Sequence, residues 1–177
     1  MAKRVNDEPI NDRPFEHPRF QYDLEACGLK RALDVLGEKW TLLVLREAVY
    51  GLRRFDDFAR ALGCGRGVLS ARLKTLIEAG VLAQRDYAEP GRRTRSEYHL
   101  TAKGRDLYPA ILALSQWSDR WAPAAEGPAA RVVDRDTQRA VSVVMTSQPD
   151  VQALTMDDIR IRLGPGAKRI QTDPKKA

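Results

Sequence analysis

The chain has 177 residues, of which 43% are hydrophobic, so it holds enough apolar material for one ordinary domain with appendages. It contains no uninterrupted run of about 18 to 20 apolar residues, and its N-terminus carries charges and prolines where a secretory signal has an apolar centre, which predicts a cytoplasmic protein with no membrane partner. Its two cysteines are too few for a disulfide scaffold, and its net charge is +6.

The first expected helix follows a polar arm. Residues 1–22 combine three prolines with many charges and few apolar anchors, which predicts a flexible N-terminal arm. Asp23 is a suitable N-cap, and the helix that it begins should run to Gly37. Its apolar stripe consists of Leu29, Ala32, Leu33 and Leu36.

Three further helices are predicted, and each ends at a glycine. The second occupies residues 37–51, and the third runs through Phe55, Phe58 and Leu62 to Gly63. The fourth extends from about Arg66 to Ala79, with Gly80 at its C-terminal end. The side chains expected to face inward are Trp40, Leu43, Val44 and Glu47 on the second helix, and Leu69, Leu73, Leu76 and Ile77 on the fourth.

The hydrophobic period then changes from helical to alternating. The runs VLAQRDY and SEYHL, separated by AEPGRRTR, predict an antiparallel hairpin with a basic loop. Thr101 should cap a long helix that reaches Ala122, and Pro109 should bend or restart it. Its apolar positions are Leu107, Ile111, Leu114, Trp117 and Trp121.

The remaining chain, residues 123–177, is predicted to be a C-terminal extension with short β strands and a basic tail. Two runs in it, ARVVD and AVSVVM, have strand character. We therefore divide the chain into an arm at 1–22, a main domain at 23–122 and an extension at 123–177. The fold class is mainly α with a small β hairpin (α+β), with a small β appendage.

Positive charge is concentrated in one segment. Residues 52–105 contain twelve Arg or Lys against six acids, and this excess equals the net charge of the whole chain. A localised basic segment is typical of a protein that binds a polyanion, although a solubilising face has the same composition.

Three short helices followed by a hairpin form the layout of a winged helix-turn-helix. In that layout the last of the three helices enters the major groove of DNA, and the hairpin tip reaches the backbone or minor groove beside it. With the leucines of the fourth helix facing inward, its other side is free to meet DNA, and Thr75 and Glu78 should point out as well. The predicted DNA-binding residues are Arg66, Ser70, Ala71, Arg72, Lys74, Arg92, Arg93 and Arg95.

Three runs in order carry a resemblance to a known family: CGLKRALDVLGEKWTLLVLREAVYGLRRFDDFARAL, VLSARLKTLIEAGVLAQRDY, and RSEYHLTAKGRDLYPAILAL with WSDRW. Roughly residues 24–121 resemble the HxlR family of bacterial transcriptional regulators, which is MarR-like. The resemblance implies a homodimer, paired through its first and last helices, that binds double-stranded DNA at inverted half-sites. We therefore expect a DNA-binding transcriptional repressor without a cofactor.

The same resemblance implies a response to electrophiles, oxidants or a small-molecule effector. Cys27 occupies the sensing position of the family, in the first turn of its helix and near Lys30 and Arg31, where a thiolate is favoured. The alternative is that Cys27 packs as a small hydrophobe at the dimer interface. Cys64 is interpreted as a packed turn residue. Some family members carry a tail whose cysteines bind zinc, but this chain has no Cys or His after His99, so no metal is expected.

Competing interpretations concern a few side chains. Trp40, Trp117 and Trp121 could line an effector pocket, but core or interface packing explains them as well. Asp56 and Asp57 suit the first turn of a helix better than a metal or acid/base site. Because no catalytic constellation stands out, we do not expect an enzyme. The remaining alternative is a winged-helix protein-interaction module without a DNA role.

Overall fold

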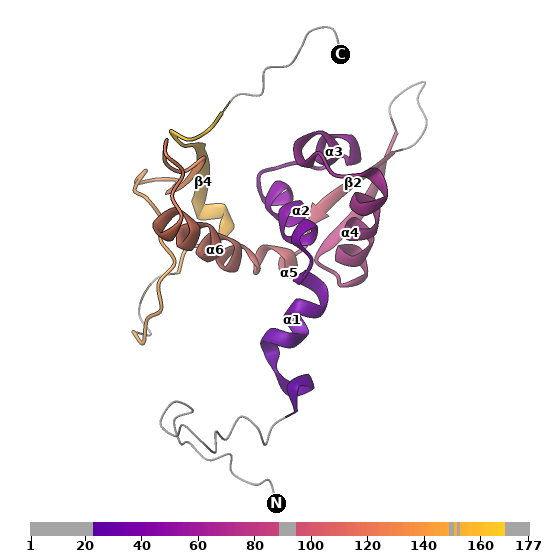
Figure 1. Cartoon of the computed structure of the whole chain (residues 1–177), viewed down its shortest axis with the longest axis horizontal. Coiled ribbons are helices and arrows are strands. Elements are labelled where there is room, and N and C mark those ends of the chain that lie inside the picture. Colours follow the sequence, from indigo (N-terminus) through magenta and orange to yellow (C-terminus); the bar gives the residue numbers. More distant parts are fainter. Residues whose placement is uncertain (1–22, 89–94, 149–150, 152, 169–177) are drawn as a thin grey trace, which may run out of the picture.

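The structure is a computed structural model that describes residues 23–88, 95–148, 151 and 153–168. In chain order it contains the short helix η2, helices α1 to α4, the hairpin β1–β2, helices α5 and α6, strand β3, the short helix η3 and strand β4, which pairs with β3 (Figure 1). This arrangement confirms the predicted α+β winged helix-turn-helix. Among the described residues, no helix has the length and apolar character needed to cross a membrane.

The first predicted helix is divided in two at Cys27. Asp23 accepts a hydrogen bond from the Glu25 backbone N–H at 3.0 Å and caps η2 (Leu24–Ala26), and α1 (Gly28–Leu36) begins after the extended backbone of Cys27. The Arg31 guanidinium donates to the carbonyls of Glu25 and Ala26, at 3.3 and 2.8 Å. These carbonyls are thereby satisfied without a continuous helix. The prediction of one helix from Asp23 to Gly37 was wrong at this point.

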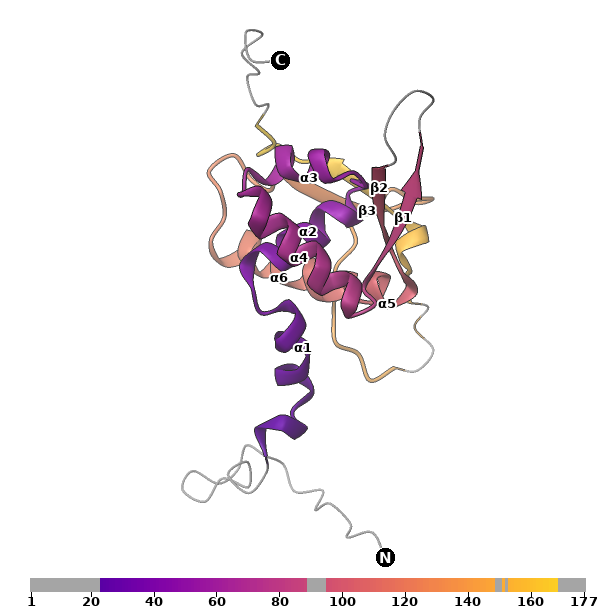
Figure 2. The same cartoon turned by 90° about the vertical axis from the view of Figure 1, so that its right-hand side faces the viewer.

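Helix α1 projects away from the rest of the chain in both views (Figures 1 and 2). None of its nine residues is buried, and Leu29 and Leu33 are 69% and 50% exposed. The predicted apolar stripe therefore exists, but among the described residues only its last member, Leu36, packs against the main core, and Leu29 and Leu33 are left uncovered. An apolar stripe of this kind needs a partner surface.

The main core lies among α2 (Lys39–Val49), α3 (Phe55–Leu62), α4 (Arg66–Glu78) and the base of the hairpin. Helix α2 packs against α3, α4, β2 and α6. Because it has neighbours on several sides, its buried face is wider than the sequence predicts, and Thr41 and Leu45 are fully buried while Trp40 and Leu43 are half-buried. The principal core side chains are Val44, Leu45, Phe58, Leu69, Leu73, Leu76, Val81 and Leu82.

Glycines end α3 and α4 as predicted. Gly63 and Gly80 have φ angles of 63° and 69°, in the left-handed region that glycine adopts without strain. Gly80 stands one residue beyond the C-cap, which is Ala79. These turns set the direction in which α4 begins and the direction in which the hairpin leaves it.

The hairpin consists of β1 (Leu82–Tyr87) and β2 (Arg95–Leu100), paired antiparallel from Leu82 with Leu100 to Tyr87 with Arg95. A single bridge between Arg54 and Glu97 adds the segment before α3 to the edge of β2. Arg95 is the first residue of β2 and not a loop residue. Arg92 and Arg93 lie outside the described residues.

The predicted long helix is interrupted. Thr101 caps α5 (Ala102–Arg105) by accepting a hydrogen bond from the Gly104 N–H at 3.1 Å, and α6 (Tyr108–Trp121) restarts with Pro109 in its first turn. The Thr101 hydroxyl donates to the Gly80 carbonyl at 2.7 Å. The LTAKG run thus ties the start of α5 to the turn that follows α4.

Gly104 is required by this contact, which gives a stability prediction. A Cβ built on Gly104 would lie 2.3 Å from the Val81 carbonyl oxygen, so the backbone would have to move. We expect Gly104→Ala to lower the free energy of unfolding by about 1 to 3 kcal/mol in denaturant titrations. Gly67→Ala on α4 is the matched control, since its Cβ would meet nothing within 4 Å and should leave stability equal or higher. Equal stability of the two variants would contradict the account of this contact.

The extension forms a second small sheet from β3 (Ala130–Asp134) and β4 (Ile159–Leu163), paired antiparallel. The ARVVD strand is confirmed, but AVSVVM is not a strand and makes only a bridge between Val133 and Ala140. The partner strand is IRIRL, whose alternating Ile and Arg were overlooked. The short helix η3 (Met156–Asp158) precedes it, with a capping box from Thr155 and Asp158.

The extension packs against α6, on the other side of the molecule from α3 and α4 (Figure 1). The Gln116 amide donates to the Val141 carbonyl at 2.8 Å and accepts from the Val143 N–H at 3.0 Å. Beside these bonds, a second apolar cluster joins Val49, Tyr108, Leu112 and Ile159. Burial raises the pKa of Tyr108 to about 12.

Candidate nucleic-acid interface

Helix α4 presents a polar face to solvent because its three leucines are buried in the core. Ser70, Ala71 and Lys74 are exposed, and Arg72 is half-buried. Thr75, which the sequence predicts to point outward, is half-buried and donates to the Ala71 carbonyl at 3.0 Å. Lys74 approaches Glu78 at 3.7 Å, but both side chains are well exposed and such a surface pair is weak.

An open groove of about 540 Å³ connects the start of α4 with the hairpin. The groove is lined by residues from the starts of α3 and α4 and from both strands of the hairpin. These residues are Arg54, Phe55, Asp56, Asp57, Arg66, Tyr87, Arg95, Ser96 and Tyr98. Two of the predicted DNA-binding residues, Arg66 and Arg95, therefore meet in one feature, although they are far apart in the sequence.

Aromatic rings position two of the arginines in this groove. The Arg66 guanidinium lies 4.6 Å from the ring centre of Phe55 and makes an ion pair with Asp56 at 3.1 Å. The Arg54 guanidinium lies 4.6 Å from the ring centre of Tyr87. Cation–π contacts of this kind hold a guanidinium in place while its remaining N–H groups still face outward.

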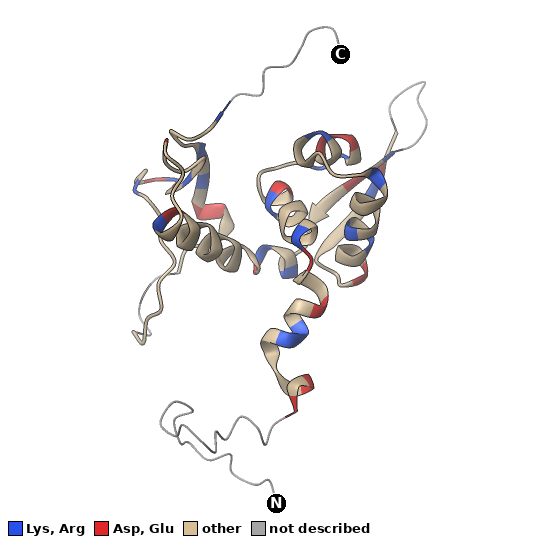
Figure 3. Ribbon diagram, in the orientation of Figure 1, with Lys and Arg blue, Asp and Glu red and all other residues tan. Residues whose placement is uncertain are grey.

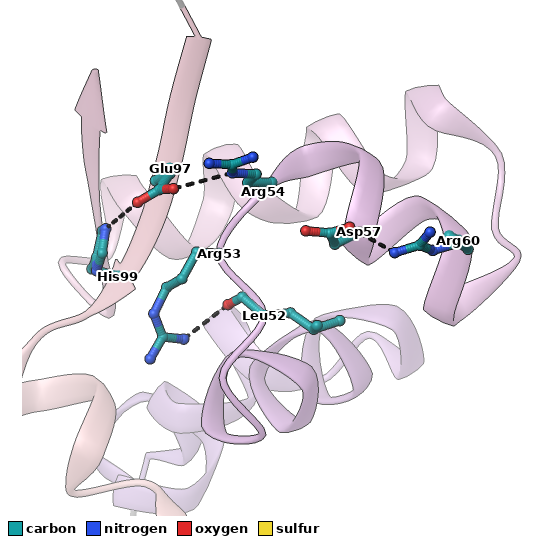
Figure 4. Close-up of polar contacts among 7 residues, drawn as sticks. All are labelled: Leu52, Arg53, Arg54, Asp57, Arg60, Glu97 and His99. Carbon is teal, nitrogen blue, oxygen red and sulfur yellow. Dashed lines mark hydrogen bonds and ion pairs between the residues drawn. The ribbon is translucent and has the colours of Figure 1, made fainter. Parts of the chain in front are cut away.

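Arg54 is also linked to the hairpin through a carboxylate (Figure 4). Its Nε donates to Glu97 Oε1 at 3.3 Å, and Glu97 Oε2 lies 3.2 Å from His99 Nε2. Nearby, burial and then the charge of Asp86 raise the pKa of Tyr98. The base of the hairpin is thus joined to the loop before α3 by side chains as well as by backbone.

The two aspartates at the start of α3 each form an ion pair with an arginine. Asp56 pairs with Arg66, and Asp57 accepts from Arg60 at 2.9 Å (Figure 4). In the part of the chain that the structure describes, no group of three or more His, Cys, Asp or Glu side chains is arranged to hold a metal ion.

Sequence reasoning missed Arg54, Phe55 and Tyr87 as members of this groove. The available signal was the run RRF directly before a helix, because an arginine at that position lies beside the start of the helix. Arg54 reaches Tyr87 because the segment before α3 is bridged to Glu97 at the edge of β2. No local sequence pattern reveals this contact between distant segments. Basic residues recur along α4 (Figure 3), and Arg95 begins β2.

Cys27 is half-buried and stands at the N-cap of α1, one position before the first turn in which the sequence predicts it. The two cations near it have other contacts. Lys30 pairs with Glu25 at 2.7 Å and with Asp34 at 3.1 Å, and these contacts raise the pKa of Lys30. Arg31 donates to backbone carbonyls of η2. The position at a helix N-terminus is one feature that favours a thiolate.

The three tryptophans lie on two helices and differ in burial. Trp40 is half-buried on α2, whereas Trp117 and Trp121 are 63% and 67% exposed on α6. Leu114 on the same helix is 57% exposed. Helix α6 therefore has an uncovered apolar stripe, as α1 has.

Comparison with known proteins identifies the fold and the family. Residues 35–126 match the HxlR-like helix-turn-helix family. The chain is 48% identical over 108 residues to Rv3095 of Mycobacterium tuberculosis, an uncharacterized HTH-type transcriptional regulator, covering 61% of this chain and 66% of that protein. It is 36% identical over 96 residues to sll1512 of Synechocystis, an uncharacterized HTH-type transcriptional regulator, covering 54% of this chain and 70% of that protein.

Two solved structures are similar over a larger part of the chain. The candidate transcription factor PA1607 has 34% sequence identity and a TM-score of 0.63, covering 78% of this chain and 96% of that one. PA1374 of Pseudomonas aeruginosa, also a candidate transcription factor, has 34% identity and a TM-score of 0.50, covering 80% of this chain and 95% of that one. This coverage exceeds what residues 1–126 could supply, so the likeness to PA1607 reaches into the C-terminal extension.

The family match covers half of the chain, and it contains α2, α3, α4 and the hairpin that build the groove. The chain belongs to the HxlR-like helix-turn-helix family of transcriptional regulators.

Proposed function

We propose that the protein is a homodimeric, sequence-specific repressor that binds double-stranded DNA at an inverted repeat. The observation that carries this proposal is the groove between α4 and the hairpin, in which Arg54, Arg66 and Arg95 lie beside the exposed face of α4. Guanidinium groups in such a place suit phosphates, and the exposed side chains of α4 suit base edges in the major groove. A dimer bound across a promoter represses by excluding polymerase.

The uncovered stripes of α1 and α6 support a dimer. Helix α1 exposes two large apolar side chains and α6 exposes three, and a second copy of the chain is the partner that can cover both stripes by symmetry. Residues 23–122 then form the DNA-binding and dimerisation domain. Residues 123–177 are an extension, and its described part packs on α6 and leaves the apolar stripe of that helix exposed.

A mobility-shift titration of the full chain on the DNA upstream of its own gene tests this function. We expect a discrete complex that survives an excess of unrelated duplex and weakens steeply as salt is raised. Binding that unrelated duplex removes completely would contradict sequence-specific regulation. The absence of any binding at low salt would favour the alternative, a winged-helix protein-interaction module.

Cys27 is proposed as the residue through which electrophiles or a small effector act on DNA binding. We expect a quinone to modify Cys27 well below pH 8.5, about the pKa of an unperturbed thiol, and to change operator affinity. Adduct mass spectrometry and operator titration measure the two effects. Cys27→Ala should remove the sensitivity of DNA binding, and Cys64→Ala is the matched control that should retain it. If Cys27→Ala keeps the full response, Cys27 only packs.

A further inference from the structure

A second cavity lies between the winged helix and the extension, apart from the groove assigned to DNA. It has a volume of about 240 Å³ and is lined by Arg53, His99, Leu100, Arg105, Met156 and Asp157. Arg53 precedes α3, Arg105 ends α5, and Met156 and Asp157 belong to η3 of the extension. The extension therefore completes this cavity.

Arg53 and Arg54 are neighbours in sequence but serve different places (Figure 4). Arg54 turns toward Glu97 and the groove, whereas Arg53 turns to the opposite side of the loop and lines the cavity. The Arg53 Nη1 donates to the carbonyls of Ala48 and Leu52, at 2.6 and 2.8 Å. These bonds fix the guanidinium through one nitrogen, and among the described residues Nε and Nη2 make no hydrogen bond of their own.

The cavity gathers more positive charge than its acid neutralises. Burial, and then the nearby charge of Arg105, lower the pKa of Arg53, while the charge of Glu97 raises it, so two like charges share a partly dehydrated space with Glu97 close by. Among the described lining residues, Asp157 is the single acid, and it already pairs with Arg105 at 3.0 Å. Glu97, close to His99, is held by Arg54 and His99. An anion is the ligand that relieves this excess.

The rest of the lining indicates the body of the ligand. Leu100 and Met156 give the cavity apolar lining, in contrast to the two charged guanidiniums. A methionine thioether also makes favourable contacts with an aromatic ring. A volume of about 240 Å³ is enough for a compact small molecule. The lining thus matches a carboxylate carried on a compact apolar group.

We propose that this cavity binds a small organic carboxylate, held by Arg53 and Arg105, with its apolar body against Leu100 and Met156. Such a ligand contacts the end of β2 and η3 at once, so it links the extension to the base of the hairpin. This binding is a property of the protein without DNA, and it does not depend on the proposed DNA-binding function.

Asp157 gives the proposal a test in which two variants have opposite effects. Asp157 competes with a ligand carboxylate for Arg105, so Asp157→Asn should tighten binding, whereas Arg105→Gln should weaken it. Both substitutions break the same ion pair. If that pair only held the extension in place, both variants would change binding in the same direction. Lys168→Gln is the matched control, because it removes a different exposed ion pair of the extension, with Glu126 at 2.9 Å.

The measurement is an NMR titration of the full chain with benzoate, in the absence of DNA. Benzamide, an uncharged molecule of the same shape, and inorganic phosphate, a charge without an apolar body, are the comparison probes. We expect saturable shifts of the Leu100 and Met156 signals with benzoate, about tenfold weaker binding in Arg105→Gln, tighter binding in Asp157→Asn, and an unchanged affinity in Lys168→Gln.

Three results would overturn the proposal. These are the absence of saturable benzoate shifts in the wild-type chain, benzamide or phosphate binding as well as benzoate, and a change of the same sign in Arg105→Gln and Asp157→Asn. Far-ultraviolet circular dichroism of each variant verifies that the fold is retained, and Arg53→Lys provides a second route if Arg105→Gln does not fold. That variant keeps the charge but loses the guanidinium fork, so it should also weaken benzoate binding.

Discussion

Substituting Trp117 by Glu should convert the protein from a dimer to a monomer and lower its operator affinity by about 100-fold to 10,000-fold. Trp117 is exposed on α6 beside Leu114 and Trp121, and in a symmetric dimer each substitution acts twice. Burying an aromatic side chain stabilises an interface by about 2 kcal/mol or more, and an unpaired carboxylate placed there opposes association. When separate monomers bind the two half-sites, the affinity gained by linking the two binding events is also lost.

Light scattering at micromolar concentration, together with operator titration, measures this effect. Leu163→Glu is the matched control, because Leu163 is also a highly exposed apolar residue but lies on β4, away from the α1 and α6 stripes. It should remain dimeric and bind DNA as the wild type does. A wild-type chain that is monomeric at micromolar concentration and still binds its operator fully would contradict the dimer.

The second prediction with a large effect distinguishes the contribution of the hairpin loop to DNA binding from that of α4. Replacing Arg92 and Arg93 by Ala should weaken specific and nonspecific DNA by similar factors, since wing arginines meet phosphates or a narrow minor groove. The slope of log affinity against log salt should fall by about one unit for each lost phosphate contact. Arg131→Ala with Arg160→Ala, two exposed arginines of the extension, is the control and should change neither quantity.

Substitutions on α4 should act differently from those in the loop. Ser70→Ala or Lys74→Ala should relax discrimination at particular base pairs, by about 1 to 3 kcal/mol where a good base contact is lost. Folding should be intact because both side chains are exposed. Affinity measured on a set of single-base operator variants distinguishes the two classes. An unchanged affinity and salt slope in the Arg92 and Arg93 double variant would show that the loop is only a solvated surface.

The winged helix was predictable because its signals are local. Gly63 and Gly80 end helices at positions that need a left-handed backbone, and the leucines of α4 fix which face remains exposed. The hairpin followed from alternation around a basic turn. Pro109 correctly indicated a restart of the last helix, and Thr101 its cap.

The features that escaped prediction depend on contacts between distant segments. The division of the first helix at Cys27 follows from the reach of Arg31 back to carbonyls of η2. Strand β3 pairs with IRIRL, a distant run that was not predicted to be a strand, while the nearer AVSVVM contributes one bridge. The groove needs Arg54 to be placed by Tyr87 and Glu97, and the second cavity needs the extension to pack on α6. Sequence periodicity contains no information on such pairings.

Selection of binding sites from a pool of random duplexes tests the proposed function most directly. The full chain is incubated with the pool at physiological salt, and the bound duplexes are recovered and sequenced over several rounds. We expect enrichment of an inverted repeat whose half-sites are separated by about one helical turn of DNA. Recovery of duplexes without a shared sequence, or of a single unrepeated half-site, would contradict a homodimeric, sequence-specific regulator.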